Sequence, residues 1–180
     1  MRMARILLLY STVDGHTREI CERLRRHWQD AGHTTELVSL DDHPELDPAA
    51  FDRVVIGASI RYGRHRQNVV DFVNRHAEAL QARPGAFFSV SLVARKPNRD
   101  SVATNPYVKR FLKTIHWRPD IVEVFAGKLD YPRYAFWDRL MIRLIMWMTK
   151  GPTHPEAVVD YTNWGQVEAF ARRVADPAAP

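Results

Sequence analysis

The sequence is poor in the residues that build several common kinds of functional site. A single cysteine, Cys21, excludes an internal disulfide and a cluster of thiolate metal ligands. Because Ile20 and Leu24 accompany Cys21 at helical spacing, we expect a buried structural thiol. The eight histidines are scattered, without a spacing such as His-Glu-x-x-His, so we predict no metal site.

Several longer sequence signatures are also missing. The chain has neither the Gly-x-Gly-x-x-Gly turn of dinucleotide folds nor a Gly-Lys-Ser/Thr loop, which argues against NAD binding and nucleotide hydrolysis. No run approaches the roughly 20 consecutive apolar residues of a membrane-spanning helix. The N-terminus runs directly into a strand-like stretch and lacks the features of a signal peptide, so we expect a cytoplasmic location.

The composition that is present fits one globular domain. With 180 residues, of which 46% are hydrophobic and 26% charged, we predict a single domain over 1–175 and a flexible tail over 176–180. The formal charge of +5 favours anionic partners, such as phosphates, carboxylates, nucleic acid or anionic lipid. Of these classes of partner, we do not expect nucleic acid.

Short apolar runs alternate with amphipathic segments along the chain. Strands are predicted over 6–10, 34–40, 53–57, 85–92 and 120–126. Helices are predicted around 20–31, 69–80, 106–115 and 164–174, the third capped by Asn105 and the last near Thr162. This alternation predicts an α/β fold with a parallel sheet covered on both faces. An insert of about 127–156 separates the fifth strand from the last helix, and residues 157–161 are expected to rejoin the sheet.

The loop after the first strand has the sequence Ser11-Thr-x-Asp-Gly-x-Thr17, and we call residues 11–17 the phosphate loop. A helix N-terminus offers unpaired N–H groups and a partial positive charge, and phosphate binds there when hydroxyls and glycine surround it. An ordinary helix cap built from Ser and Thr is the alternative. The predicted phosphate contacts are Ser11, Thr12, Val13, Asp14, Gly15, His16 and Thr17.

Motifs along nearly the whole chain resemble one family. The phosphate loop resembles that of flavodoxins, and five further stretches resemble the flavodoxin-like menaquinone-dependent protoporphyrinogen oxidases of bacteria. These stretches are 53–63 (RVVIGASIRYG), 91–97 (SLVARKP), 117–120 (WRPD), 131–134 (YPRY) and 138–146, which joins Asp138-Arg139 to an apolar run. The resemblance implies a flavodoxin-like sheet of five parallel strands in the order 2-1-3-4-5, with FMN as cofactor.

The resemblance also implies that the loops after the third and fourth strands flank the flavin ring. The residues concerned are Ser59, Ile60, Arg61, Tyr62 and Gly63 in the first loop, and Ser91, Leu92, Val93 and Ala94 in the second. Tyr62 is the candidate for stacking on the ring, because an aromatic face matches a flat molecule; a surface turn tyrosine is the alternative. The second loop has no aromatic residue, which leaves one ring face open for a second flat molecule.

Basic residues accompany both of these loops. The substrate that the family implies, protoporphyrinogen IX, carries two propionates, and arginine pairs well with carboxylates. We therefore predict that the substrate is bound by Arg61, Arg64, Arg95 and Lys96. Ordinary solvated surface charge is the alternative. No acid–base pair is evident, and we assign no catalytic residue, because the flavin carries the redox step.

The segment Ala135–Lys150 inside the insert has the pattern of an interfacial helix. At about 100° per residue, its cations form one narrow stripe and apolar side chains cover most of the remainder. The cations are Arg139, Arg143 and Lys150, with Trp137 and Trp147 near the two ends. Such a helix suits the surface of a membrane or contact with an apolar ligand. Packing in a homo-oligomer or against the sheet is the alternative.

The favoured hypothesis is an enzyme of haem biosynthesis. It would be an FMN-dependent oxidoreductase that converts protoporphyrinogen IX to protoporphyrin IX and passes the electrons to menaquinone or ubiquinone. We expect it at the cytoplasmic side of the cell membrane as a peripheral protein. A nicotinamide-dependent quinone reductase, an electron-transfer flavodoxin and a binding module without redox function remain open.

Overall fold

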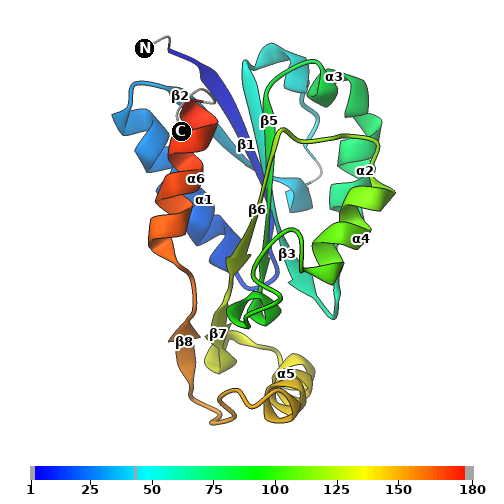
Figure 1. Cartoon of the computed structure of the whole chain (residues 1–180), viewed down its shortest axis with the longest axis vertical. Coiled ribbons are helices and arrows are strands. Elements are labelled where there is room, and N and C mark those ends of the chain that lie inside the picture. The colour runs from blue at the N-terminus through cyan, green and yellow to red at the C-terminus, as the bar shows by residue number, and fades with distance from the viewer. Residues whose placement is uncertain (1–2, 43, 177–180) are drawn as a thin grey trace.

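The computed structural model describes residues 3–42 and 44–176, which form a parallel sheet between two layers of helices (Figure 1). Apart from Asp176, the predicted flexible tail lies outside the described residues. No helix in the described part of the chain is both long enough and apolar enough to cross a bilayer.

The strand order matches the predicted flavodoxin-like topology. The strands are β1 (Arg5–Ser11), β2 (Thr34–Ser39), β3 (Arg53–Arg61), β4 (Arg64–His65), β5 (Gly85–Ser91), β6 (Ile121–Ala126), β7 (Lys128–Asp130) and β8 (Val158–Asp160). The main path is β2-β1-β3-β5-β6, and all of its pairs are parallel. This is the predicted order 2-1-3-4-5, to which the structure adds the short β4, antiparallel to β3.

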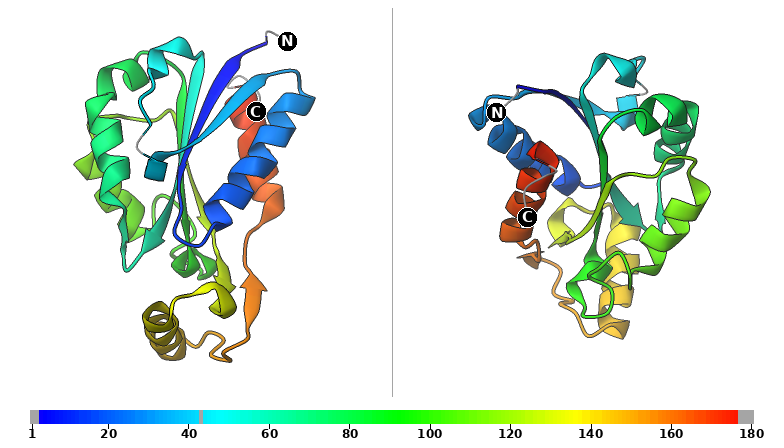
Figure 2. Two further views of the ribbon diagram at one scale, coloured as in Figure 1. Left: turned by 180° about the vertical axis from the view of Figure 1, so that it is seen from behind. Right: turned by 45° about the horizontal axis from the view of Figure 1, so that its top comes forward.

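Helices cover both faces of the sheet because its central strands are apolar on both sides (Figure 2). The helices are α1 (His16–Asp30), α2 (Gln67–Arg75), α3 (Ala77–Gln81), α4 (Pro106–Thr114), α5 (Phe136–Met148) and α6 (Trp164–Ala175). In β1, Ile6 and Leu8 pack with residues of α1 and α6. The intervening Leu7 and Leu9 pack with residues of α2, α3 and α4. Cys21 is buried in the first of these layers, as expected, and burial raises the pKa of its thiol.

The structure corrects two predicted boundaries. The helix expected over 69–80 is divided into α2 and α3 at His76, whose φ of −107° leaves helical geometry. The loop expected after Gly57 is instead a continuation of β3 to Arg61, because the chain turns there into β4. The last helix is capped at Asn163, next to Thr162 as expected, and the Asn163 side chain accepts from the Gln166 N–H.

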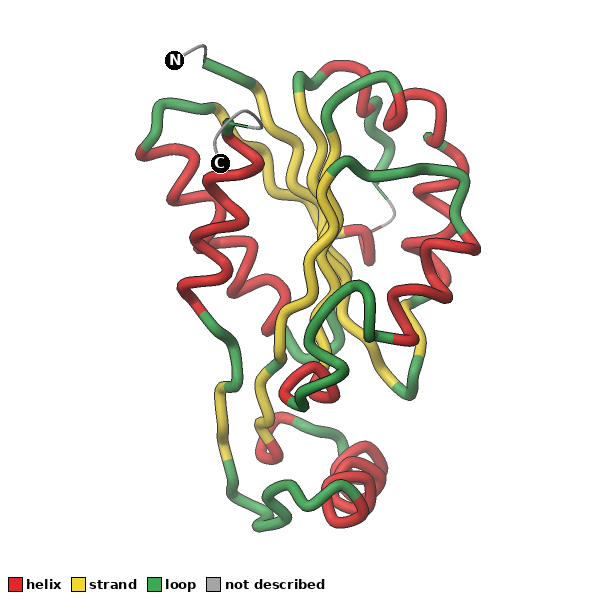
Figure 3. Tube along the Cα trace, in the orientation of Figure 1, coloured by secondary structure: helices red, strands yellow, loops and turns green. Residues whose placement is uncertain are grey.

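The expectation that residues 157–161 rejoin the main sheet is wrong. Strand β8 pairs antiparallel with β7, which continues the chain just beyond β6 and past the edge of the main sheet (Figure 3). The insert therefore leaves and returns as a two-stranded ribbon at the carboxyl ends of the parallel strands. Helix α5 lies at the far end of this ribbon, held through Ile142 and Met146 against a small cluster that includes Leu129 and Tyr131.

Candidate functional site

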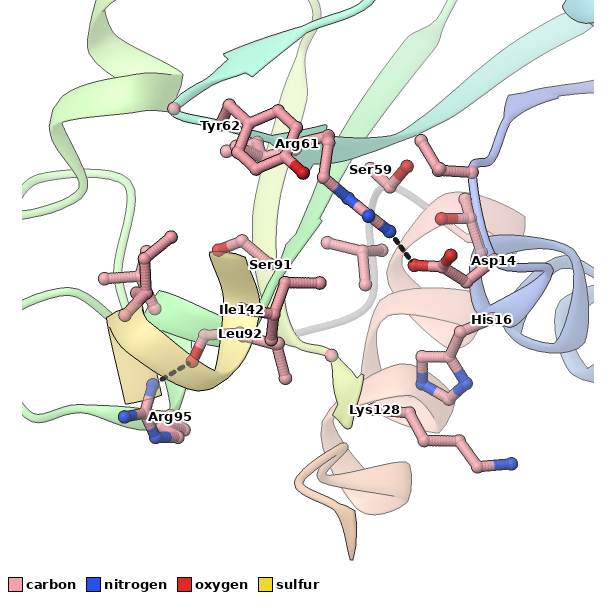
Figure 4. Close-up of a pocket in the computed structure, with 18 of the residues that line it drawn as sticks. Asp14, His16, Ser59, Arg61, Tyr62, Ser91, Leu92, Arg95, Lys128 and Ile142 are labelled. Atoms are coloured by element: carbon pink, nitrogen blue, oxygen red, sulfur yellow. Dashed lines mark hydrogen bonds and ion pairs between the residues drawn. The ribbon is translucent and has the colours of Figure 1, made fainter. Parts of the chain in front are cut away.

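A cavity of about 260 Å³ lies at the carboxyl edge of the sheet, where ligands bind in doubly wound folds. Its walls come from the phosphate loop, the β3–β4 turn, the segment after β5 and the insert (Figure 4). The predicted residues that line it are Thr12, Val13, Asp14, His16, Thr17, Ser59, Ile60, Arg61, Tyr62, Gly63, Ser91, Leu92, Val93 and Arg95. The predicted residues outside its lining are Ser11, Gly15, Arg64, Ala94 and Lys96.

Three hydroxyls in this lining are buried without a hydrogen-bond partner among the described residues. They belong to Thr17 in α1, Ser59 in β3 and Ser91 at the end of β5. An unsatisfied buried hydroxyl costs about 1–3 kcal/mol, so three in one cavity indicate a site built for a polar ligand. Residues of these types at these positions fit the phosphate and the polar edge of a flavin mononucleotide.

The start of α1 adds backbone donors to the same wall. Gly15 precedes the helix at φ 89°, a conformation that favours glycine, and no described side chain caps the helix there. The first amides of α1 have no partner within the helix and carry its positive end. Together with Thr17, they form an arrangement that can hold a phosphate monoester.

Other members of the phosphate loop are already engaged with protein groups. The Ser11 hydroxyl donates to Asp41 at 3.0 Å, and the Thr12 hydroxyl accepts from the Gly15 N–H at 2.9 Å. His16 places one ring nitrogen 3.0 Å from Glu19 and the other 2.6 Å from the Thr162 hydroxyl. These contacts shape the loop and connect it to the segment after β8.

The turn between β3 and β4 presents an aromatic ring at the cavity. Tyr62 and Gly63 both have positive φ, 51° and 78°, as in the tight two-residue turns of hairpins. A Cβ on Gly63 would lie 3.2 Å from the Tyr107 ring, so glycine allows this close approach. Tyr107, in the first turn of α4, also lines the cavity. The sequence analysis did not predict it as a site residue.

Arg61 is partly buried between two carboxylates. Its guanidinium contacts Asp14 in the phosphate loop and lies 3.3 Å from Asp138 in α5. Burial acts to lower the pKa of Arg61, but Asp14 and Asp138 outweigh it and raise that pKa. Burial also raises the pKa of Asp14, against the opposing effect of Arg61. The positive charge of Arg61 is therefore largely compensated within the protein.

The four basic residues predicted for the substrate do not gather around one rim. Arg61 and Arg95 line the cavity, whereas Arg64 is exposed on β4 and Lys96 lies outside the lining. Arg95 donates to the Leu92 carbonyl at 3.0 Å (Figure 4). It also donates to the Thr149 hydroxyl at 2.9 Å, which ties the segment after β5 to the end of α5.

The insert supplies a second wall that sequence reasoning did not assign to the site. Its contributors are Gly127, Lys128, Tyr134, Ile142, Ile145, Met146 and Thr149. The buried side of α5, with Ile142 and Met146 one turn apart, makes this insert wall mainly apolar. The helical periodicity of 135–150 indicated a mainly apolar helix. It did not show which side of that helix faces the cavity.

The fold and the cavity together define a flavodoxin-like protein with a flavin site. The family model described as "Flavodoxin domain" matches residues 7–156. Oxidised Flavodoxin 1 from Bacillus cereus has the same fold, with a TM-score of 0.56 at 11% identity, covering 97% of this chain and 99% of that one.

Curated relatives define the family more narrowly. The protein named protoporphyrinogen IX dehydrogenase [quinone] of Escherichia coli K12 is 46% identical over 169 residues, covering 94% of this chain and 93% of the relative. The Leishmania major protein of the same name is 42% identical over 92% of this chain and 72% of its own length. The chain belongs to the quinone-dependent protoporphyrinogen IX dehydrogenase family, within the flavodoxin domain family.

Proposed function

We propose that this protein oxidises protoporphyrinogen IX to protoporphyrin IX with FMN as cofactor and a membrane quinone, menaquinone or ubiquinone, as acceptor. Removal of six hydrogens in three two-electron steps would reduce three quinones to quinols. FMN, when bound, supplies the two-electron redox chemistry that joins these two half-reactions. Identity of 46% over 94% of the chain to a relative with this name is the observation that carries the proposal.

The sheet-side wall of the cavity, made by the phosphate loop, the β3–β4 turn and the end of β5, would bind the cofactor. The first amides of α1 and the Thr17 hydroxyl would hold the phosphate. The unpartnered hydroxyls of Ser59 and Ser91 would donate to polar atoms of the flavin. Tyr62, at the tip of the hairpin, would stack on its ring.

The insert wall would receive the flat, largely apolar reactant. Ile142 and Met146 exclude water from that side of the cavity, and Leu92 and Val93 continue the apolar surface. Of the predicted carboxylate-binding residues, Arg95 has the better placement for a propionate. Its partners are a carbonyl and a hydroxyl, which leave its charge uncompensated, whereas two carboxylates surround Arg61.

We also propose that α5 rests on the cytoplasmic surface of the cell membrane. Away from the cavity it exposes a face of seven large apolar residues, namely Phe136, Trp137, Leu140, Met141, Leu144, Trp147 and Met148. The exposed cations Arg143 and Lys150 lie along one edge of this face, where they complement anionic headgroups. A quinone dissolved in the bilayer would then be close to the insert wall. A homo-oligomer joined through α5 is the competing arrangement.

Anaerobic oxidation of protoporphyrinogen IX, followed by porphyrin fluorescence, tests the proposed reaction. The FMN-loaded protein should form porphyrin when a menaquinone analogue is added. Without it, oxidation should stop once each FMN has accepted two electrons, one third of those that one porphyrin releases. Rapid reduction of the flavin by NADPH would instead indicate a nicotinamide-dependent quinone reductase. A stable blue semiquinone without porphyrin formation would indicate an electron carrier.

A further inference from the structure

Arg61 joins two parts of the site that are far apart in the sequence. Through one side of its guanidinium it contacts Asp14 of the phosphate loop, and Nη1 lies 3.3 Å from Asp138 Oδ2 in the first turn of α5. The Arg61 side chain is only 16% exposed. The contact with Asp138 is an ion pair, and the attraction between two charges is stronger where water is partly excluded.

The second oxygen of Asp138 has a different partner. The Tyr62 hydroxyl donates to Asp138 Oδ1, so one carboxylate holds both the arginine and the tyrosine of the β3–β4 turn. The Tyr62 ring is 52% exposed and stands on a backbone with φ 51°. The Arg61 guanidinium carbon lies 5.9 Å from the centre of this ring, and the hydrogen bond to Asp138 fixes the position of its hydroxyl end.

Asp138 itself does not line the cavity. It lies four residues before Ile142 and eight before Met146, on the side of α5 that packs toward the cavity. A contact at Asp138 therefore fixes the N-terminal end of the helix whose later turns form the insert wall.

We propose that Asp138 is a positioning residue, which orients the Tyr62 ring at the cavity and fastens the first turn of α5 across it. Only the identity of the molecule beside Tyr62 rests on the proposed function. The attachment of α5 does not depend on it. Removal of Asp138 leaves Arg61 paired with Asp14, so its buried charge keeps a partner and the fold should survive.

The test uses three substitutions of graded chemistry in the FMN-loaded protein. Asp138→Ala removes both contacts, Asp138→Asn keeps an acceptor oxygen without the charge, and Asp138→Glu keeps the charge on a longer side chain. Glu168→Gln is the matched control, because Glu168 pairs with Arg23 on the surface, away from the cavity. Three readouts use the FMN-loaded protein: the visible circular dichroism of the bound flavin, its fluorescence and the rate of FMN release. A fourth uses the flavin-free protein, in which the rate of tryptic cleavage at the exposed Arg143 reports how firmly α5 is attached.

We expect Asp138→Ala to change the flavin dichroism, raise its fluorescence, and accelerate both FMN release and cleavage by about fivefold, the scale of one polar contact between partly exposed side chains. Asp138→Asn should be intermediate, Asp138→Glu should restore most of the wild-type signals, and Glu168→Gln should match wild type. Wild-type behaviour of Asp138→Ala in all readouts would overturn the proposal. So would equal effects of the Ala and Glu variants, which would indicate a role in folding alone.

These outcomes are separable from failure of the proposed function. A protein that binds FMN and responds to Asp138 substitution but forms no porphyrin would contradict the reaction and support the positioning role. If the chain bound no flavin, the rate of cleavage at Arg143 would still decide whether Asp138 fastens α5.

Discussion

The sheet-side wall of the cavity is polar and made by short loops, whereas the insert wall is mainly apolar and made by one side of a helix. The first wall holds three buried hydroxyls without described partners, Thr17, Ser59 and Ser91. The second offers mainly Ile142 and Met146. The proposed function places the cofactor at the sheet-side wall and the exchangeable reactants at the insert wall, so substitutions in one wall should leave the function of the other largely intact.

The largest effect is expected from the sheet-side wall. Thr17→Val keeps the side-chain shape but removes the hydroxyl, and a hydrogen bond to a charged group contributes about 1.5–3 kcal/mol. FMN affinity, measured by fluorescence titration, should fall roughly 10- to 100-fold. Thr35→Val is the matched control, because the Thr35 hydroxyl on β2 is also buried without a described partner but lies outside the cavity. Equal losses in both variants would contradict the assignment.

The acid sensitivity of the protein around the β3–β4 hairpin should be of comparable size. His65 on β4 is buried, its ring lies 2.8 Å from the Ser89 hydroxyl, and burial lowers its pKa to about 4. Between the unfolded value near 6.5 and about pH 4, the unfolded chain binds the extra proton, so stability falls as the pH falls, by at most about 1.4 kcal/mol per pH unit. Above pH 6.5 this contribution is constant.

Urea unfolding at a series of pH values checks this dependence, with His65→Gln as the comparison. The variant should show a shallower loss of stability between pH 6.5 and about 4. Parallel curves for the two proteins would show that His65 does not carry the effect.

A smaller effect is expected on the outer side of the insert. Trp147 is 71% exposed on α5, and Trp147→Ser should weaken binding to anionic lipid vesicles about fivefold by reducing the apolar area that can be buried. Cosedimentation measures the binding, and Met3→Ser, at an equally exposed apolar residue outside α5, is the control. If Trp147→Ser instead shifted the protein from oligomer to monomer without changing vesicle binding, α5 would be a protein interface.

The smallest effect is expected on the inner side of the same helix. Ile142→Val removes one methylene from the insert wall, which costs about 0.5–1.5 kcal/mol in a packed environment. We expect the KM for protoporphyrinogen IX to rise about threefold while FMN affinity stays within a factor of two. A larger change in FMN affinity than in KM would contradict the proposal that the insert wall binds the reactant and the sheet-side wall binds the cofactor.

The sequence was informative where function depends on local chemistry. The start of α1 after the phosphate loop and the Asn105 cap of α4 could be predicted because each depends on a few adjacent residues. The strand order was implied by the resemblance to the flavodoxin-like family. The contacts of Arg61 with Asp14 and Asp138 could not be predicted, because they join residues 47 and 77 positions apart through side chains whose directions only the fold sets.

In the insert, the sequence predicted the helix but not its orientation relative to the cavity. Periodicity predicted the helix, and the structure places it at Phe136–Met148, within the expected 135–150. Apolar residues cover most sides of this helix, so the sequence does not indicate which side lines the cavity. That side is set by the orientation in which the β7–β8 ribbon holds the helix. Tyr107 was missed for a related reason, since its place in the first turn of α4 becomes significant only when α4 meets the β3–β4 turn.

Comparison of FMN with riboflavin tests the central assignment most directly, because the two molecules differ only in the phosphate. Titration of the flavin-free protein with each should show FMN binding at least about 100-fold more tightly, and Thr17→Val should reduce that preference. Equal affinity for the two flavins, unchanged in the variant, would contradict the claim that the start of α1 binds a phosphate.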